Sequence, residues 1–174
     1  MNRAARYAIP GIAVALCMSG SRLGAQPKFV WNASASAPIG LYRIVSVLTP
    51  AAGDLVAVRP PVAMRLFLAQ RGYLPDGALL LKRIVASSGD VICRDGEHVL
   101  VAGTQIARAK QSDARGRPLP QWQGCRSLRE QEVFLVNADV PDSLDGRYFG
   151  PLPGSSIVGL AHPVWTAGED SGRN

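Results

Sequence analysis

From residue 27 onward, apolar residues come in short runs that Gly, Pro and Asp residues interrupt. Such runs are typical of β-strands, because a helix needs a longer periodic segment. Strands are predicted at residues 40–46, 54–58, 78–87, 90–94, 98–101, 132–137 and 157–163. One helix is predicted at residues 61–73, where Pro61 precedes an apolar stretch and Gly72 lies near its end. The sequence therefore predicts a mainly β domain with an antiparallel sheet and one short helix, not alternating β-α-β units.

The first 25 residues have the layout of an export signal. Arg3 and Arg6 precede an uncharged apolar stretch at residues 7–21. Cleavage after Ala25 would place Leu23 at position −3, where export signals carry a small residue. We therefore expect residues 1–25 to be retained as a membrane anchor, in preference to a cleaved signal or a buried core helix. The positive-inside rule then places residues 26–174, as one exported domain, on the periplasmic side of the inner membrane.

The net charge of +6 first suggests an anionic partner. The sequence does not fit a nucleic-acid partner, because the arginines are dispersed and aromatic residues make up only 6% of the chain, too few for a stacking platform. We therefore predict no nucleic-acid partner and expect membrane lipid instead. Among the 19 cationic residues only Lys28, Lys82 and Lys110 are lysines.

Cysteine and histidine are scarce in the exported part. Cys93 and Cys125 either form a disulfide in an oxidising compartment or remain free thiols. No Cys or His cluster has the spacing of a metal site, so neither a metal nor another cofactor is expected. His98 and His162 are candidate bases for a serine nucleophile, but neither lies in a setting that indicates this role.

Lys82 lies in the most apolar part of the exported domain, Ala78 to Ala86. Burial would lower the pKa of its ammonium and leave a neutral amine that can act as a general base. The alternative is an exposed lysine on the solvent face of an edge strand. Because successive strand residues point to opposite faces, either Lys82 or Arg83 should face inward.

Two further segments carry candidate chemistry. Ser34 and Ser36 are two residues apart, so in an extended backbone both hydroxyls lie on one side; the alternative is a polar turn. Asp145 and Arg147 flank Gly146, and a salt bridge across a turn explains them without any catalytic role.

Taken in order, these motifs resemble the type I signal peptidase superfamily. They are Ser-x-Pro-x-Gly-Leu-Tyr from Ser36, Leu-Lys-Arg-Ile-Val-Ala from Leu81 followed by Gly-Asp, and Asp-Gly-Arg-Tyr-Phe-Gly-Pro from Asp145. The chain is most similar to the conjugative-transfer branch of TraF-like peptidases, which mature pilin subunits. The resemblance implies a coiled β-sheet domain of signal-peptidase type. Ser36-Ala37-Pro38 is one residue shorter than the general signal peptidase pattern and lacks its Met, which favours a dedicated peptidase.

The resemblance also implies roles for individual residues. Ser36 matches the nucleophile and Lys82 the general base of a serine–lysine dyad. Ser34, with the backbone N–H of Ser36, matches the oxyanion hole. Asp145 matches a catalytic helper and Arg147 a residue that braces the site.

The expected function is a membrane-anchored serine endopeptidase that processes exported precursor proteins, with pilin maturation as the specific case. Two alternatives remain open. One is a general type I signal peptidase. The other is a non-catalytic domain that binds subunits during pilus assembly.

Overall fold

The computed structural model of the protein describes residues 27–167. The predicted anchor at residues 1–25 lies outside these described residues. Within residues 27–167, no helix is both long enough and apolar enough to cross a membrane.

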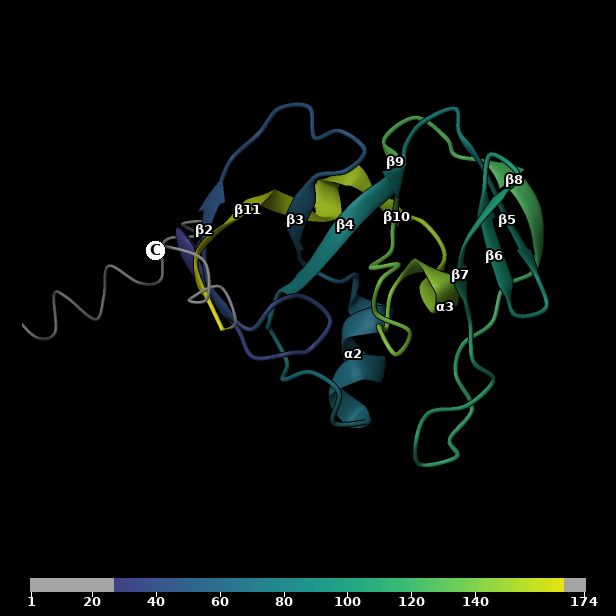
Figure 1. Ribbon diagram of the computed structural model, residues 1–174, viewed down its shortest axis with the longest axis horizontal. Coiled ribbons are helices and arrows are strands. Elements are labelled where there is room, and N and C mark those ends of the chain that lie inside the picture. The colour runs from purple at the N-terminus through teal and green to yellow at the C-terminus, as the bar shows by residue number, and fades with distance from the viewer. Residues whose placement is uncertain (1–26, 168–174) are drawn as a thin grey trace, which may run out of the picture.

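The described chain forms two antiparallel sheets (Figure 1). The larger has seven strands in the order β1-β2-β11-β3-β4-β9-β10, and the smaller has four in the order β7-β6-β5-β8. The strands of the larger sheet are β1 (Phe29–Asn32), β2 (Gly40–Val45), β3 (Leu55–Val58), β4 (Leu80–Ala86), β9 (Glu132–Leu135), β10 (Leu152–Pro153) and β11 (Ile157–Thr166). Those of the smaller are β5 (Val91–Asp95), β6 (His98–Val101), β7 (Thr104–Arg108) and β8 (Gly124–Ser127).

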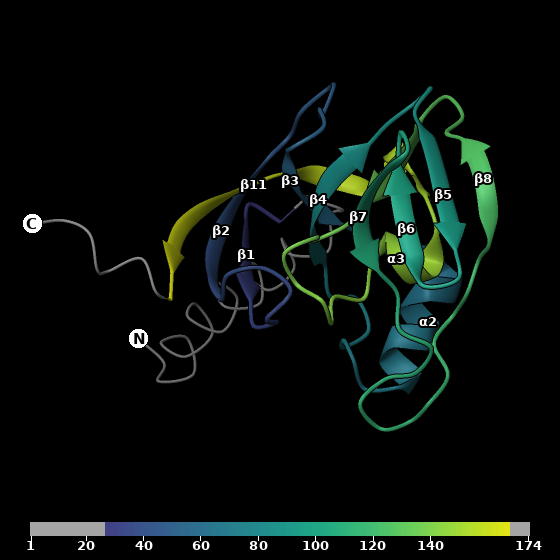
Figure 2. The same cartoon turned by 45° about the vertical axis from the view of Figure 1, so that its right-hand side comes forward.

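The turned view in Figure 2 separates the β1–β2–β11 end of the large sheet from the small sheet. Between them, helix α2 (Val62–Gln70) packs its buried residues Met64 and Leu68 against β3, β4 and β9. Gly72 ends this helix in a left-handed conformation, with φ of 70°. The helix is therefore shorter than the predicted 61–73, because residues after Gln70 turn away from the axis.

The predicted fold class is confirmed: the domain is mainly β, its sheets are antiparallel, and all seven predicted strands are present. The prediction of a single helix was incomplete. A second short helix, α3 (Gly146–Phe149), and a 3₁₀ turn (Gly154–Ser156) follow β9. Strands β1, β7, β8 and β10 were also not predicted.

Helix α3 begins where Asp145 caps its first turn by accepting a hydrogen bond from the Arg147 N–H, with N···O of 3.1 Å. Gly146 is required at the start of α3. A Cβ there would lie 2.7 Å from the Phe134 ring and 2.8 Å from the Leu135 carbonyl oxygen. This close approach holds α3 against β9, and so places the 137–147 segment beside β4.

Candidate active site

The loop that carries Ser34 and Ser36 joins β1 to β2 and is a turn, not the extended segment considered from the sequence. The two hydroxyl oxygens nevertheless lie 2.9 Å apart. Asn32, buried at the end of β1, holds the loop from inside. Its Nδ2 donates to the carbonyls of Ser34, Ala37 and Pro38, at 2.9 to 3.0 Å. Its Oδ1 accepts from the backbone N–H and the hydroxyl of Ser34. One buried amide therefore holds Ser34 and the turn that carries both serines.

Lys82 is the inward-facing member of the Lys82–Arg83 pair. Its side chain is 2% exposed, whereas Arg83 is exposed and donates to the Gly53 carbonyl. Burial lowers the pKa of the Lys82 ammonium from 10.5 to about 8, and this effect exceeds the opposing attraction of Asp145. A small further lowering comes from the charge of Arg147. A tenth or so of Lys82 is then neutral near pH 7.

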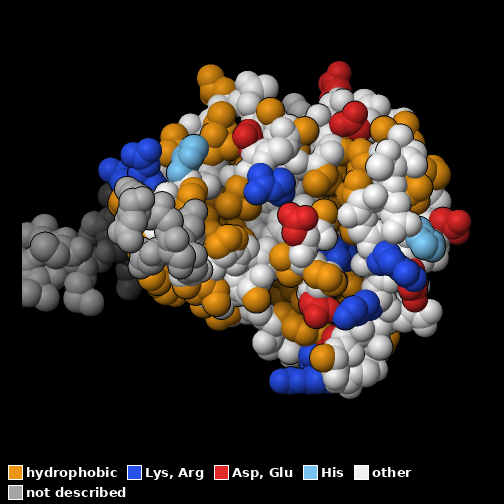
Figure 3. Space-filling view, in the orientation of Figure 1, with side chains coloured by type: hydrophobic (Ala, Val, Ile, Leu, Met, Phe, Trp, Pro, Cys, Tyr) orange, Lys and Arg blue, Asp and Glu red, His pale blue; other side chains and the backbone are white. Residues whose placement is uncertain are grey.

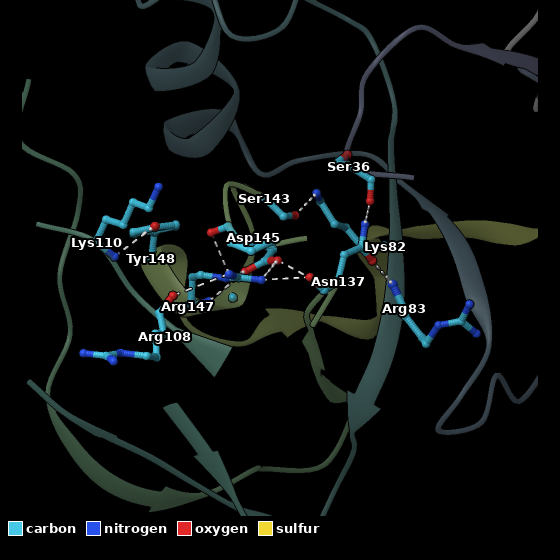
Figure 4. Close-up of polar contacts among 12 residues, drawn as sticks. Ser36, Lys82, Arg83, Arg108, Lys110, Asn137, Ser143, Asp145, Arg147 and Tyr148 are labelled. Carbon is cyan, nitrogen blue, oxygen red and sulfur yellow. Dashed lines mark hydrogen bonds and ion pairs between the residues drawn. The ribbon is translucent and has the colours of Figure 1, made fainter. Parts of the chain in front are cut away.

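Ser143 supplies the hydrogen-bond partner of Lys82. The Lys82 Nζ donates to Ser143 Oγ at 2.8 Å, and both groups are buried. Figure 4 shows the two side chains pointing toward each other, from β4 and from the segment before α3. Among the described residues no hydrogen bond joins Ser36 to Lys82. The Ser143 bond therefore fixes the direction of the amine independently of Ser36.

Asp145 and Arg147 form a buried ion pair, with Nε and Oδ1 at 2.8 Å and Nη2 and Oδ2 at 3.1 Å. Arg147 also donates to the carbonyls of Pro141 and Asn137. Asp145 accepts from the Asn137 N–H at 3.1 Å, and none of its hydrogen bonds reaches Lys82. In this structure the pair braces the 137–147 segment, and the catalytic assignment of Asp145 stays a prediction.

Two cavities meet at Ser36. The first, of about 210 Å³, brings Ser34, Ser36, Lys82 and Ser143 to one space, although no single stretch of sequence contains them. The second, of about 590 Å³, has a mostly apolar wall that includes Ile39, Leu55, Val85 and Val136. Ala35, Ser36 and Val140 line both cavities. An extended peptide passing Ser36 thus has room for side chains on either side.

The histidines lie elsewhere. His98 bonds to Gln105 on the small sheet, and His162 is exposed on β11. Neither lines a cavity that contains Ser36. A Ser-His-Asp arrangement is therefore not built by the described residues.

Three residues of the site were not singled out from the sequence: Asn32, Asn137 and Ser143. Ser143 lies two residues before Asp145, which begins the third motif, and that position was its only signal. Asn32 is the last residue of β1 and Asn137 lies two residues beyond β9. A lone asparagine at the end of a strand is an ordinary turn residue. Their roles depend on contacts with distant segments.

The open question of the cysteines is resolved by the smaller sheet. Cys93 on β5 and Cys125 on β8 are directly paired and form a disulfide. Across residues 27–167, no group of three His, Cys, Asp or Glu side chains is arranged to hold a metal ion.

Comparison with known proteins supports the family resemblance that the three motifs indicated. The family model described as "Signal peptidase, peptidase S26" matches residues 2–166. A "Plasmid transfer protein TraF" of Escherichia coli is 32% identical over 95% of this chain and 97% of its own length. A "Probable conjugal transfer protein TraF" of Sinorhizobium fredii is 34% identical over 78% of this chain and 76% of its own.

A solved signal peptidase I from Enterococcus faecalis V583 matches 66% of this chain and 98% of its own, with 19% identity and a TM-score of 0.38. That similarity is too distant to inform the site. The family match and the full-length relatives are sufficient: the chain belongs to the peptidase S26 family of signal peptidases and is TraF-like within it.

Proposed function

We propose that the chain is a serine endopeptidase that uses Ser36 and Lys82 as a dyad to process exported precursor proteins. The setting is conjugal transfer, which the names of its relatives state, and the specific substrate class is a pilin-like precursor. One observation carries the proposal. A lysine whose pKa is about 8 shares a cavity with a serine hydroxyl that a buried amide network holds in place.

The chemistry follows from these groups. The neutral Lys82 amine takes the Ser36 proton as Ser36 Oγ attacks the scissile carbonyl carbon. The carbonyl π electrons move to oxygen and form the tetrahedral oxyanion. When that intermediate collapses, the C–N bond breaks and the Lys82 ammonium returns its proton to the leaving amine. Water, or a second amine of the substrate, then attacks the acyl carbon as the Lys82 amine takes its proton. The ester bond to Ser36 Oγ breaks, and Lys82 returns the proton to Ser36.

The oxyanion requires donors at the loop. Ser34 is the side-chain candidate, and its hydroxyl now donates to Asn32 Oδ1. The backbone N–H of Ser36 is the second candidate, because no acceptor among residues 27–167 takes it. One such donor is worth roughly 3 kcal/mol of transition-state stabilisation. Ser34 must rotate from Asn32 to the oxyanion, a change of one hydroxyl torsion.

Membrane attachment completes the proposal, with residues 1–25 as anchor and the described domain in the periplasm. Phe29, Trp31, Val164 and Trp165 are exposed, and the two tryptophans stack with ring centres 5.8 Å apart. They lie on β1 and β11, and β1 begins four residues after the end of the proposed anchor at residue 25. Hydrophobic side chains also gather over the β2–β11 side of the face in Figure 3. Tryptophans at this position suit a bilayer interface, and membrane lipid is therefore the second proposed partner.

The test is mass spectrometry of pilin-like precursors co-expressed with the full-length chain. The wild type should shorten a precursor, whereas Ser36→Ala and Lys82→Met should leave it intact. Ser155→Ala and Lys28→Met, which change exposed residues, are the matched controls and should process it normally. A product lighter by one water than the hydrolysed peptide identifies transfer to an internal amine.

Other outcomes separate the alternatives. Processing of many unrelated signal peptides would identify a general signal peptidase. Normal pilus assembly and transfer with Ser36→Ala would instead identify a non-catalytic binding domain.

A further inference from the structure

Asn137 lies two residues beyond the end of β9 and is 9% exposed. Its side-chain amide bonds to two segments that are remote in sequence. Nδ2 donates to the Ser36 carbonyl, across 101 residues, and to the Leu81 carbonyl at 3.1 Å. Oδ1 accepts from the Arg83 N–H at 2.9 Å. Figure 4 shows the Asn137 side chain reaching between Ser36 and the strand that carries Lys82.

The two bonds to β4 fall immediately before and after Lys82. A single planar amide therefore fixes the backbone on both sides of the proposed base, and its remaining N–H holds the backbone of the proposed nucleophile. Without this amide, the β1–β2 loop would hold Ser36 and β4 would hold Lys82, but the two segments would lose the side chain that bonds to the backbone of both. The position of Ser36 relative to Lys82 would then no longer be set by this contact.

The backbone of Asn137 is fixed in turn by the buried ion pair. Its N–H donates to Asp145 Oδ2 at 3.1 Å, and its carbonyl accepts from Arg147 Nη2 at 2.9 Å. The Asp145–Arg147 pair makes no hydrogen bond to Lys82 or Ser36, although its charges act on the pKa of Lys82. Its hydrogen bonds connect it to the reacting groups through Asn137.

We propose that Asn137 is the positioning residue that sets Ser36 in register with Lys82, an inference that rests on the proposed function. Only a primary amide offers two donors and one acceptor in one plane. An aspartate at this place keeps the shape and the acceptor for Arg83 N–H, but turns an oxygen toward the carbonyls of Ser36 and Leu81. An alanine removes all three bonds.

The experiment uses the full-length chain in detergent micelles and a quenched fluorescent peptide with Ala at positions −3 and −1 of its cleavage site. Single-turnover cleavage is measured for the wild type, Asn137→Ala and Asn137→Asp. It gives a rate constant and an amplitude, and the amplitude reports the fraction of the enzyme that is active. The control is Gln121→Ala, which removes an exposed amide. Steady-state kcat and KM, and thermal unfolding, are measured on the same samples.

A positioning role predicts a rate constant lower by about 30-fold or more in both variants, because a misplacement of about 1 Å costs on the order of 100-fold. The amplitude stays full and KM stays within twofold. A purely structural role lowers the amplitude and the melting temperature but leaves the rate constant within threefold of wild type, and this result would overturn the inference. Asn137→Asp retains the shape of the side chain. If Asn137→Ala does not fold, the rate constant of Asn137→Asp alone tests the inference.

The results that would contradict the proposed function differ from those that would contradict only the role of Asn137. If the wild type does not cleave the peptide, or if Ser36→Ala cleaves it as fast as the wild type, then the dyad is wrong and the inference falls with it. If the wild type cleaves through Ser36 while both Asn137 variants keep its rate constant, only the inference about Asn137 is wrong.

Discussion

At the scale of single residues, the site depends on one lysine and on the groups that direct it. Lys82 is buried among β4 neighbours such as Leu80 and Ile84, and its amine has a serine as hydrogen-bond acceptor instead of a carboxylate. Burial keeps the pKa of the ammonium low, and a serine hydroxyl opposes this less than a carboxylate partner would. Both the orientation of the amine and its readiness to accept a proton therefore have local causes.

Ser143→Ala tests the orientation of the amine. We expect kcat to fall by about 10- to 100-fold, because the Lys82 amine loses the partner that aims it, while the domain stays folded. The apparent pKa for activity should fall at the same time, since the ammonium loses an acceptor. Peptide cleavage measured across pH checks both effects, with Ser155→Ala as the control. A kcat equal to that of the wild type would show that Ser143 does not direct the amine.

Lys82→Met tests the energetic cost of burying the amine. Because folding lowers the pKa of Lys82 from 10.5 to about 8, the unfolded state binds more protons between these values. The free energy of unfolding of the wild type should therefore rise with pH across that window, by about 3 kcal/mol relative to Lys82→Met. Below pH 8 the cost of burial is fully present, and above pH 10.5 it is absent.

Urea unfolding of both chains at several pH values between 7 and 11 measures this difference. Lys28→Met, which changes an exposed lysine, should follow the wild type. A difference between the wild type and Lys82→Met that does not change with pH would mean that the amine is not perturbed by burial.

At the scale of helices and strands, the predictions succeeded where an apolar pattern was strong. The strand of Lys82 and the helix beginning after Pro61 both bury apolar side chains that the sequence displays. Strand β8, Gly-Cys-Arg-Ser, is exposed along its whole length and has no apolar pattern to detect. Strand β10 has two residues, one of them Pro153 at the sheet edge.

Helix α3 was missed for a related reason. It has four residues and depends on the Asp145 cap and on the close packing of Gly146 against Phe134. Neither is visible in hydrophobic periodicity. The segment was correctly interpreted as containing an Asp145–Arg147 salt bridge, but its role in holding the 137–147 backbone required the fold.

A further prediction concerns the disulfide in the small sheet. The Cys93–Cys125 disulfide joins β5 to β8 across 32 residues of chain. Replacing both residues by Ser should lower the free energy of unfolding by about 3 kcal/mol, because the unfolded chain regains the freedom of that loop. Peptide cleavage well below the unfolding temperature should stay within twofold of wild type, since neither cysteine lines a cavity containing Ser36.

Thermal unfolding and cleavage rates of the double variant check this prediction. A large loss of cleavage with unchanged stability would instead connect the small sheet directly to the site. One such connection is Arg94 on β5, which donates to the Arg147 carbonyl at 2.7 Å.

At the scale of the whole molecule, the site is an assembly of three distant segments: the β1–β2 loop, β4 and residues 137–147. The order of strands in the large sheet brings them together. The sequence made Ser36 and Lys82 candidates because each lies in a motif of its own. Asn137 and Ser143 act across 101 and 61 residues respectively, so their roles could not be predicted before the sheet order was known.

The central claim is that an unprotonated Lys82 activates Ser36, and the pH dependence of kcat/KM for peptide cleavage by the full-length chain tests it most directly. A base that must be neutral predicts a rate that rises with pH and levels off above a single apparent pKa near 8. Both Ser36→Ala and Lys82→Met should be inactive at every pH. A profile that is flat from pH 6 to 10, or cleavage that survives in Lys82→Met, would contradict the account.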